Sequence, residues 1–72
     1  HLYPNPMTTG ARLELPQGTF DITLYDITGA CIRTLPKQQG MVVIERESLA
    51  SGVYQLNVSQ GEVVKSVRLV VE

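Results

Sequence analysis

The sequence has little of what most active sites are built from. Its 72 residues include one cysteine, one histidine, one phenylalanine and no tryptophan. A nucleophilic triad needs a well-placed base and a zinc site needs about four closely placed ligands, so His1 and Cys31 alone supply neither. The oxygens of Asp26 and Thr28 fall short of the roughly six to eight that calcium takes. We therefore expect no enzyme activity, no metal site and no cofactor.

Charge of one sign and long apolar runs are also lacking. Six Lys and Arg residues against seven Asp and Glu give a formal net charge of −1, so no basic excess favours nucleic acid or anionic lipid. The longest apolar run, residues 41–44, is far shorter than the ~20 residues that span a bilayer. Nucleic-acid binding and membrane insertion are not expected. Because Cys31 has no partner cysteine, no internal disulfide can form, and we expect Cys31 to be a small, half-buried hydrophobic residue. A reactive thiol or an intermolecular bridge, which would need a basic neighbourhood, is the alternative.

The start of the chain has the character of a linker. It begins with His1 and not with methionine, so we expect a piece cut from a longer parent. Residues 3–6 read Tyr-Pro-Asn-Pro, and each proline fixes its own φ at about −65° and favours extended geometry in the residue before it. Residues 1–9 are therefore expected to form an extended lead-in with little hydrogen bonding of its own. Residues 10–72 are expected to form one small domain.

Short alternating runs, separated by Gly, Pro and Asn or Asp, dominate the rest of the chain. No stretch of about ten residues follows the helical period of about 3.6 residues. The spacing of the turn signals predicts an all-β fold, a small antiparallel immunoglobulin-like β-sandwich of about seven strands. The side chains predicted to face its core are Ala11, Leu13 and Leu15, then Phe20, Ile22 and Leu24, then Tyr54, Leu56 and Val58.

The turns divide the chain into strands. In residues 26–29, Asp26 is placed to accept a turn N–H and Gly29 to adopt the left-handed bulge position, which predicts a hairpin. Its return strand is expected over residues 30–35, with Pro36 ending the pairing because proline lacks an N–H. The apolar run in residues 41–45 suggests a strand covered on both faces or one that carries a bulge.

Residues 49–54, which read Leu-Ala-Ser-Gly-Val-Tyr, form the most structured local motif. In immunoglobulin-like sandwiches a tyrosine just after a corner donates its hydroxyl to the backbone a few residues upstream. We expect Tyr54 to do so, with Gly52 allowing a close backbone approach and Leu49 completing the motif. A role for Tyr54 in contacting a ligand is the alternative.

The last strand is long and rich in valine, over residues 62–71. Lys65 and Arg68 interrupt it, and because they are three positions apart, strict alternation places them on opposite faces. They can act as charged residues that keep an edge strand from pairing with other chains. The same charges could serve recognition.

In this order the motifs resemble the C-terminal sorting domain of cargo proteins in the type IX secretion system of Bacteroidota. The resemblance covers nearly the whole chain, and its specificity lies in the order and spacing of the motifs. They are Tyr3-Pro4-Asn5-Pro6, Leu24-Tyr25-Asp26-Ile27-Thr28-Gly29, Leu49-x-x-Gly52-Val53-Tyr54 and Lys65-x-x-Arg68-Leu69-Val70-Val71. Family members often end in a basic residue, whereas this chain ends in Glu72.

The resemblance implies a non-enzymatic address label at the end of a larger exported cargo protein. Such a cargo passes through the periplasm, and its C-terminal domain is recognised by the outer-membrane translocon and its shuttle protein. A sortase-like protease commonly removes the domain upstream of the lead-in, residues Tyr3, Pro4, Asn5 and Pro6. The cargo then lies at the cell surface or outside the cell.

We place recognition on the last strand, where a receptor could pair by strand addition. The backbone of residues 67–71 would dock, Lys65 and Arg68 would add charge contacts, and the same strand could pair two copies. The residues assigned to recognition are Lys65, Val67, Arg68, Leu69, Val70 and Val71.

Two alternatives stay open for the whole domain. An immunoglobulin-like adhesion or carbohydrate-binding module could share the sandwich, although only Tyr3 and Tyr25 are expected to be exposed for stacking on sugars. A structural spacer that braces a neighbouring domain is the other alternative. Both would leave delivery to the cell surface independent of this domain.

Overall fold

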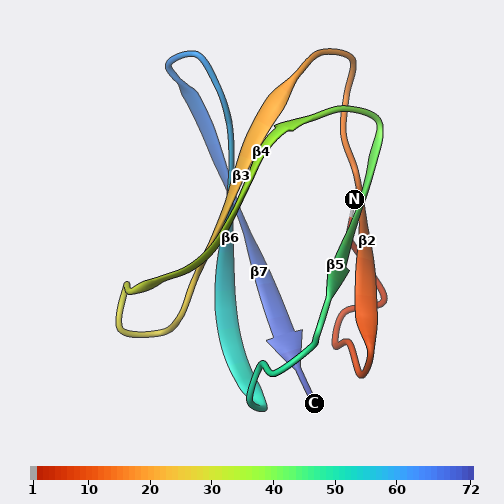
Figure 1. The fold of residues 1–72 in the computed structure, drawn as a ribbon, viewed down its shortest axis with the longest axis vertical. Coiled ribbons are helices and arrows are strands. Elements are labelled where there is room, and N and C mark those ends of the chain that lie inside the picture. The colour runs from red at the N-terminus through yellow and green to blue at the C-terminus, as the bar shows by residue number, and fades with distance from the viewer. Residues whose placement is uncertain (1) are drawn as a thin grey trace.

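Two layers of antiparallel strands make up the computed structural model, which describes residues 2–72 (Figure 1). One sheet has three strands in the order β1-β2-β5, and the other has four in the order β4-β3-β6-β7. No helix long and apolar enough to span a membrane occurs in residues 2–72. The strands are β1 Leu2–Tyr3, β2 Gly10–Glu14, β3 Phe20–Tyr25, β4 Cys31–Gln38, β5 Met41–Glu45, β6 Gly52–Gln60 and β7 Val63–Val71. The predicted immunoglobulin-like sandwich of about seven strands is confirmed.

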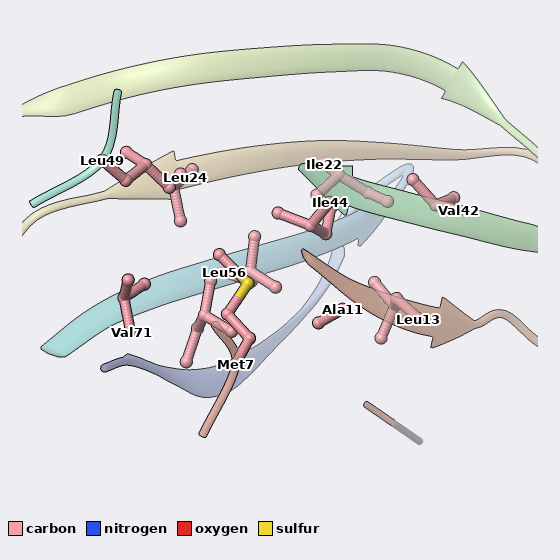
Figure 2. Close-up of a cluster of buried hydrophobic side chains, with 11 residues drawn as sticks. Met7, Ala11, Leu13, Ile22, Leu24, Val42, Ile44, Leu49, Leu56 and Val71 are labelled. Carbon is pink, nitrogen blue, oxygen red and sulfur yellow. The ribbon is translucent and has the colours of Figure 1, made fainter. Parts of the chain in front are cut away.

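The core lies between the layers and is made of apolar side chains from both sheets (Figure 2). The alternation in β2, β3 and β6 predicted its positions correctly, since those side chains are buried or half-buried against the core. Burying one large apolar side chain contributes about 1.5–3 kcal/mol. The core cluster consists of Met7, Ala11, Leu13, Ile22, Leu24, Val42, Ile44, Leu49, Leu56, Leu69 and Val71.

Strand β5 is an ordinary half-buried strand, so the expectation of two covered faces or a bulge is wrong. It pairs with β2 in continuous register from Gly10 opposite Glu45 to Glu14 opposite Met41. Val42 and Ile44 are buried, while Met41 and Val43 remain 50% and 57% exposed. The apolar run reflects strand propensity on the outer face as well as burial on the inner one.

Strand β4 continues past Pro36 to Gln38, so the prediction that pairing ends at Pro36 is also wrong. The register with β3 shifts between Phe20 and Ile22, which places Pro36 in a β-bulge on an edge strand, where its missing N–H is tolerated. Lys37 has a φ of 54°, and its N–H donates to the Asp21 carboxylate at 3.0 Å. That side-chain bond replaces the ladder bond that the bulge removes.

Residues 2–9 are integrated with the sandwich, so the expectation of an extended lead-in with little hydrogen bonding is wrong. Leu2 and Tyr3 form β1 opposite Leu13 and Arg12. Met7 is 0% exposed, and Figure 2 shows its side chain pointing into the core cluster. The predicted lead-in boundary at residue 9 therefore does not separate packed from unpacked chain within residues 2–72. His1 lies outside the described residues.

Cys31 is exposed and not half-buried as expected. It pairs with Tyr25 just after the turn, where the β3–β4 register shifts. A bulge changes which face later side chains occupy, so alternation along the sequence could not place this residue. Its sulfur lies 3.7 Å from the Thr34 hydroxyl.

Candidate docking edge

Strand β7 is the last strand of the four-stranded sheet, with β6 along one side. The β6–β7 pairing keeps one register from Gly52 opposite Val71 to Gln60 opposite Val63. Figure 1 shows the tip of this hairpin extending away from β2 and β5. A strand in this position presents backbone groups on its outer side.

The side chains assigned to recognition divide between the two faces of β7. Leu69 and Val71 are buried and Val67 is half-buried against the core. These three side chains therefore stabilise the fold. Lys65 lies on the same face but beyond the core, and it is exposed. Arg68 is exposed on the opposite, outer face, as regular alternation requires.

The lead-in occupies the outer side of β7 over residues 68–72, which we call the closed half. The Asn5 side chain donates from Nδ2 to the Arg68 carbonyl at 2.7 Å and accepts the Val70 N–H on Oδ1 at 2.9 Å. Met7 N–H donates to the Val70 carbonyl at 2.8 Å, and Glu72 N–H donates to the Met7 carbonyl at 2.9 Å. Asn5 thus imitates a strand residue with its side-chain amide.

These bonds correct the expectation that the backbone of residues 67–71 is free for docking. The Arg68 carbonyl, the N–H and C=O of Val70 and the Glu72 N–H already have partners in the lead-in. A second strand cannot use them while Asn5 and Met7 remain in place. The first half of β7 differs in this respect.

Residues Val63–Val67, which we call the open half, have no such cover. In an antiparallel pair, alternate residues direct their backbone groups toward and away from the partner strand. Since Arg68 and Val70 direct theirs outward, Val64 and Ser66 do so too. No backbone hydrogen bond joins those outward groups to another residue in the described part of the chain. Val63 and Val64 are also 62% and 55% exposed.

A groove runs beside the open half, on the core side of β7. Its volume is about 400 Å³. Apolar side chains from both sheets form most of its wall, and Glu14, Gln60 and Lys65 add polar groups. The apolar lining consists of Leu13, Leu15, Pro16, Phe20, Val58, Val63 and Val67.

The outer face beside Arg68 is polar and internally bonded. Gln55 Nε2 donates to Asn57 Oδ1 at 2.9 Å and to Ser66 Oγ at 3.2 Å, and the Ser66 hydroxyl donates to Asn57 Oδ1 at 3.0 Å. Those side chains satisfy one another. The side chains of Lys65 and Arg68 have no ion-pair or hydrogen-bond partner among the described residues.

Arg46 connects the closed half to the rest of the domain, and no sequence motif predicts this role. Its guanidinium donates to the backbone oxygens of Thr8 and Glu72 through Nη1 and to that of Leu49 through Nε at 3.1 Å. Nη2 adds a bond to the Ser51 hydroxyl at 3.3 Å. Arginine can do this because its five N–H donors diverge from one planar group.

The corner before β6 has the geometry of a tyrosine corner. The Tyr54 hydroxyl donates to the Ala50 carbonyl at 2.7 Å, and Leu49 is buried beneath it. Gly52 acts differently from the expected close approach, because a Cβ built there meets nothing within 4 Å. Its φ of +155° is the property that disfavours other residues.

The turn over residues 26–29 closes the β3–β4 hairpin as its sequence predicts. Gly29 has a φ of +91°, and its N–H donates to the Asp26 carbonyl at 3.0 Å. Asp26 Oδ1 accepts from the Thr28 hydroxyl at 2.6 Å and from the N–H groups of Thr28 and Ala30. The Thr28 hydroxyl, with these backbone donors, holds the pKa of Asp26 below its ordinary value.

Residues 2–72 bring together no three His, Cys, Asp or Glu side chains that could hold a metal ion. The candidate site consists of a strand edge, a groove beside it and two unpaired cations. A site of this class can bind an extended segment through backbone and shape.

Comparison with known proteins agrees with that class. The chain belongs to the family of type IX secretion system C-terminal sorting domains, since the model described as "Secretion system C-terminal sorting domain" matches residues 1–72. Members of this family sort an attached cargo to the cell surface or extracellular space. A comparison with curated proteins gives no match.

Among solved structures, the chain is similar to part of PorZ from Porphyromonas gingivalis, with a TM-score of 0.84 and 24% sequence identity. That protein is described as "an essential bacterial surface component of the type-IX secretion system". The similarity covers 100% of this chain and 11% of that one. At this identity it establishes the shared fold.

Proposed function

We propose that this domain is a non-catalytic signal that the type IX apparatus recognises through strand β7. The translocon or its shuttle protein binds the folded domain in the periplasm, and the attached cargo then crosses the outer membrane. The observation that carries the proposal is the open half of β7, an unpaired strand edge next to two unpaired cations. Such edges bind extended segments by strand addition.

Lys65 and Arg68 supply charge contacts in this proposal. They project from opposite faces of one strand, so a partner that wraps the edge meets a positive charge on each side. The buried side chains of Leu69 and Val71 hold the strand in place and do not contact the partner.

Removal of the domain by a sortase-like protease fits best at a bond before Leu2. Cleavage there leaves Tyr3, Pro4, Asn5 and Pro6 attached, and with them β1 and the bonds from Asn5 and Met7 to β7. Cleavage after Asn5 would separate β1 from the domain. The lead-in in this proposal is part of the signal and not a disposable linker.

The test is delivery of a periplasmic reporter fused to residues 1–72 in a bacterium that has this secretion system. We expect surface or medium delivery of the fusion and periplasmic retention of the reporter alone. Delivery should fall for the double variant Lys65→Glu with Arg68→Glu. Arg12→Glu is the control: it reverses the charge of an exposed side chain on β2, in the other sheet, and should keep delivery.

The alternatives predict a different pattern. An adhesion or carbohydrate-binding module, or a spacer, would leave delivery unchanged with or without the domain. Tyr3 and Tyr25 are both half-buried, which does not favour stacking on sugars. Delivery that is independent of residues 1–72 would contradict the proposal.

A further inference from the structure

We propose that the open half of β7 and the groove beside it bind an extended peptide segment of a partner protein, with apolar and acidic side chains in alternation. This inference rests on the proposed function and specifies the kind of partner that the edge fits. The peptide adds to β7 along Val64 and Ser66. Its inward side chains lie over the groove.

The backbone of β7 sets the first requirement on the partner. Val64 and Ser66 each present an outward N–H and C=O with no partner among the described residues. Only an extended backbone offers donors and acceptors at the matching spacing of alternate residues. The occupant is therefore a strand and not a helix or a compact loop.

The lead-in sets the limits of the added strand. Asn5 and Met7 already form a short ladder on the closed half, so the proposed peptide continues an existing line of bonds. Asn5 marks the end of the open half, because its side-chain amide donates to the Arg68 carbonyl. A partner strand must therefore end before Arg68.

The groove and the exposed cations determine which side chains the partner peptide should carry. Leu15, Phe20 and Val67 line the groove, so an added strand gains by placing apolar residues on that side. Arg68 is exposed on the opposite, outer face and has no ion-pair partner among the described residues, which favours a carboxylate on the outer face of the partner.

A second copy of this chain fits the open half less well. An antiparallel pair of two open halves that sets Val64 opposite Ser66 places Lys65 of one copy opposite Lys65 of the other, and like charges facing each other across strands are destabilising. The occupant we propose is for this reason a different chain with acidic residues.

The probe is a capped hexapeptide, Thr-Val-Glu-Val-Thr-Val, added to the chain of residues 1–72. We expect amide hydrogen exchange at Val64 and Ser66 to slow about tenfold when the peptide is present at about ten times its Kd. Val64→Thr should keep this protection, because it keeps the N–H and a β-branched side chain. Val64→Pro should lose the protection at Ser66, where both variants keep an amide, because proline removes the outward N–H of residue 64 and leaves the bonds between β7 and β6 in place.

A charge exchange covers the case in which Val64→Pro fails to fold. Arg68→Glu should weaken binding of the Glu-containing peptide by about tenfold, and a peptide with Lys in place of its Glu should recover binding to that variant. Both measurements use a chain whose β6–β7 ladder is intact.

Three results would overturn the inference. The first is amide exchange at Val64 and Ser66 that the peptide does not change. The second is equal protection of Ser66 by the peptide in Val64→Thr and Val64→Pro. The third is protection that rises with protein concentration alone, which would mean that a second copy binds the edge. The proposed function is tested separately, since reporter delivery that requires Lys65 and Arg68 could stand while the peptide fails to protect the edge. Peptide protection combined with delivery that ignores both cations would leave this inference standing and contradict the docking route.

Discussion

Removing the Asn5 side chain tests whether the lead-in really closes half of β7. Asn5→Ala deletes the bonds to the Arg68 carbonyl and the Val70 N–H. Each such bond contributes about 0.5–1.5 kcal/mol net, so the pair is worth about 1–3 kcal/mol. Because Asn5 is exposed, water can reach the freed groups, and we expect a loss of about 1–2 kcal/mol. Urea unfolding at neutral pH measures it.

The control is Thr8→Ala, which shortens an exposed side chain in the same segment and removes no side-chain bond. It should change the free energy of unfolding by less than about 0.5 kcal/mol. Amide exchange at Val70 gives a second readout and should rise in Asn5→Ala only. A loss below about 0.5 kcal/mol together with unchanged protection of Val70 would mean that Asn5 does not hold the closed half of β7.

Three further substitutions test the parts of the framework that hold this edge in place. Tyr54→Phe removes the bond to the Ala50 carbonyl and should cost about 1 kcal/mol in urea unfolding; no change would mean that the corner does not depend on this hydroxyl. Arg46→Met removes the bonds to the Thr8 and Glu72 oxygens, and amide exchange at Glu72 should rise while that at Leu56 stays slow. The pKa of Asp26 is held below its ordinary value of 3.8, so its contribution is complete above that value and is lost as the pH falls through the lowered folded pKa. Asp26→Asn should flatten that part of the stability profile, and an unaltered acid limb would contradict the role of this carboxylate.

The alternation of apolar and polar residues predicted the buried side chains well in strands that are regular and have one buried face. Ala11 and Leu13 are buried as predicted, and so is Leu24. It failed where a strand departs from those conditions. The bulge at Pro36 is compatible with pairing because β4 is an edge strand, and a strand's place in the sheet order is not visible in local sequence.

The closed half of β7 could not be predicted, because its contacts join distant parts of the chain. Asn5 contacts Arg68 and Val70, which follow it by 63 and 65 positions in the sequence. Arg46 contacts Thr8 and Glu72, which are 38 and 26 positions from it. No spacing rule links such residues. Two prolines around Asn5 instead suggested a linker, although the same segment carries the buried Met7.

The long valine-rich strand was identified correctly, but the sequence did not show that the backbone of its second half is already bonded to residues 5 and 7. Val67 to Val71 are the more apolar residues, yet Leu69 and Val71 face the core and the outward backbone of Val70 is bonded. Hydrophobic pattern reports burial of side chains and carries no information about which backbone groups are already paired.

Delivery of the reporter fused to residues 1–72 carrying Val64→Pro, compared with Val64→Thr, decides whether the secretion apparatus binds the open half of β7. Both variants alter one exposed side chain, and only the proline removes an outward N–H from the open half of β7. When urea unfolding shows that both variants are folded, we expect surface delivery of the threonine variant and periplasmic retention of the proline variant. Equal delivery of the two would mean that the secretion apparatus does not bind this strand edge.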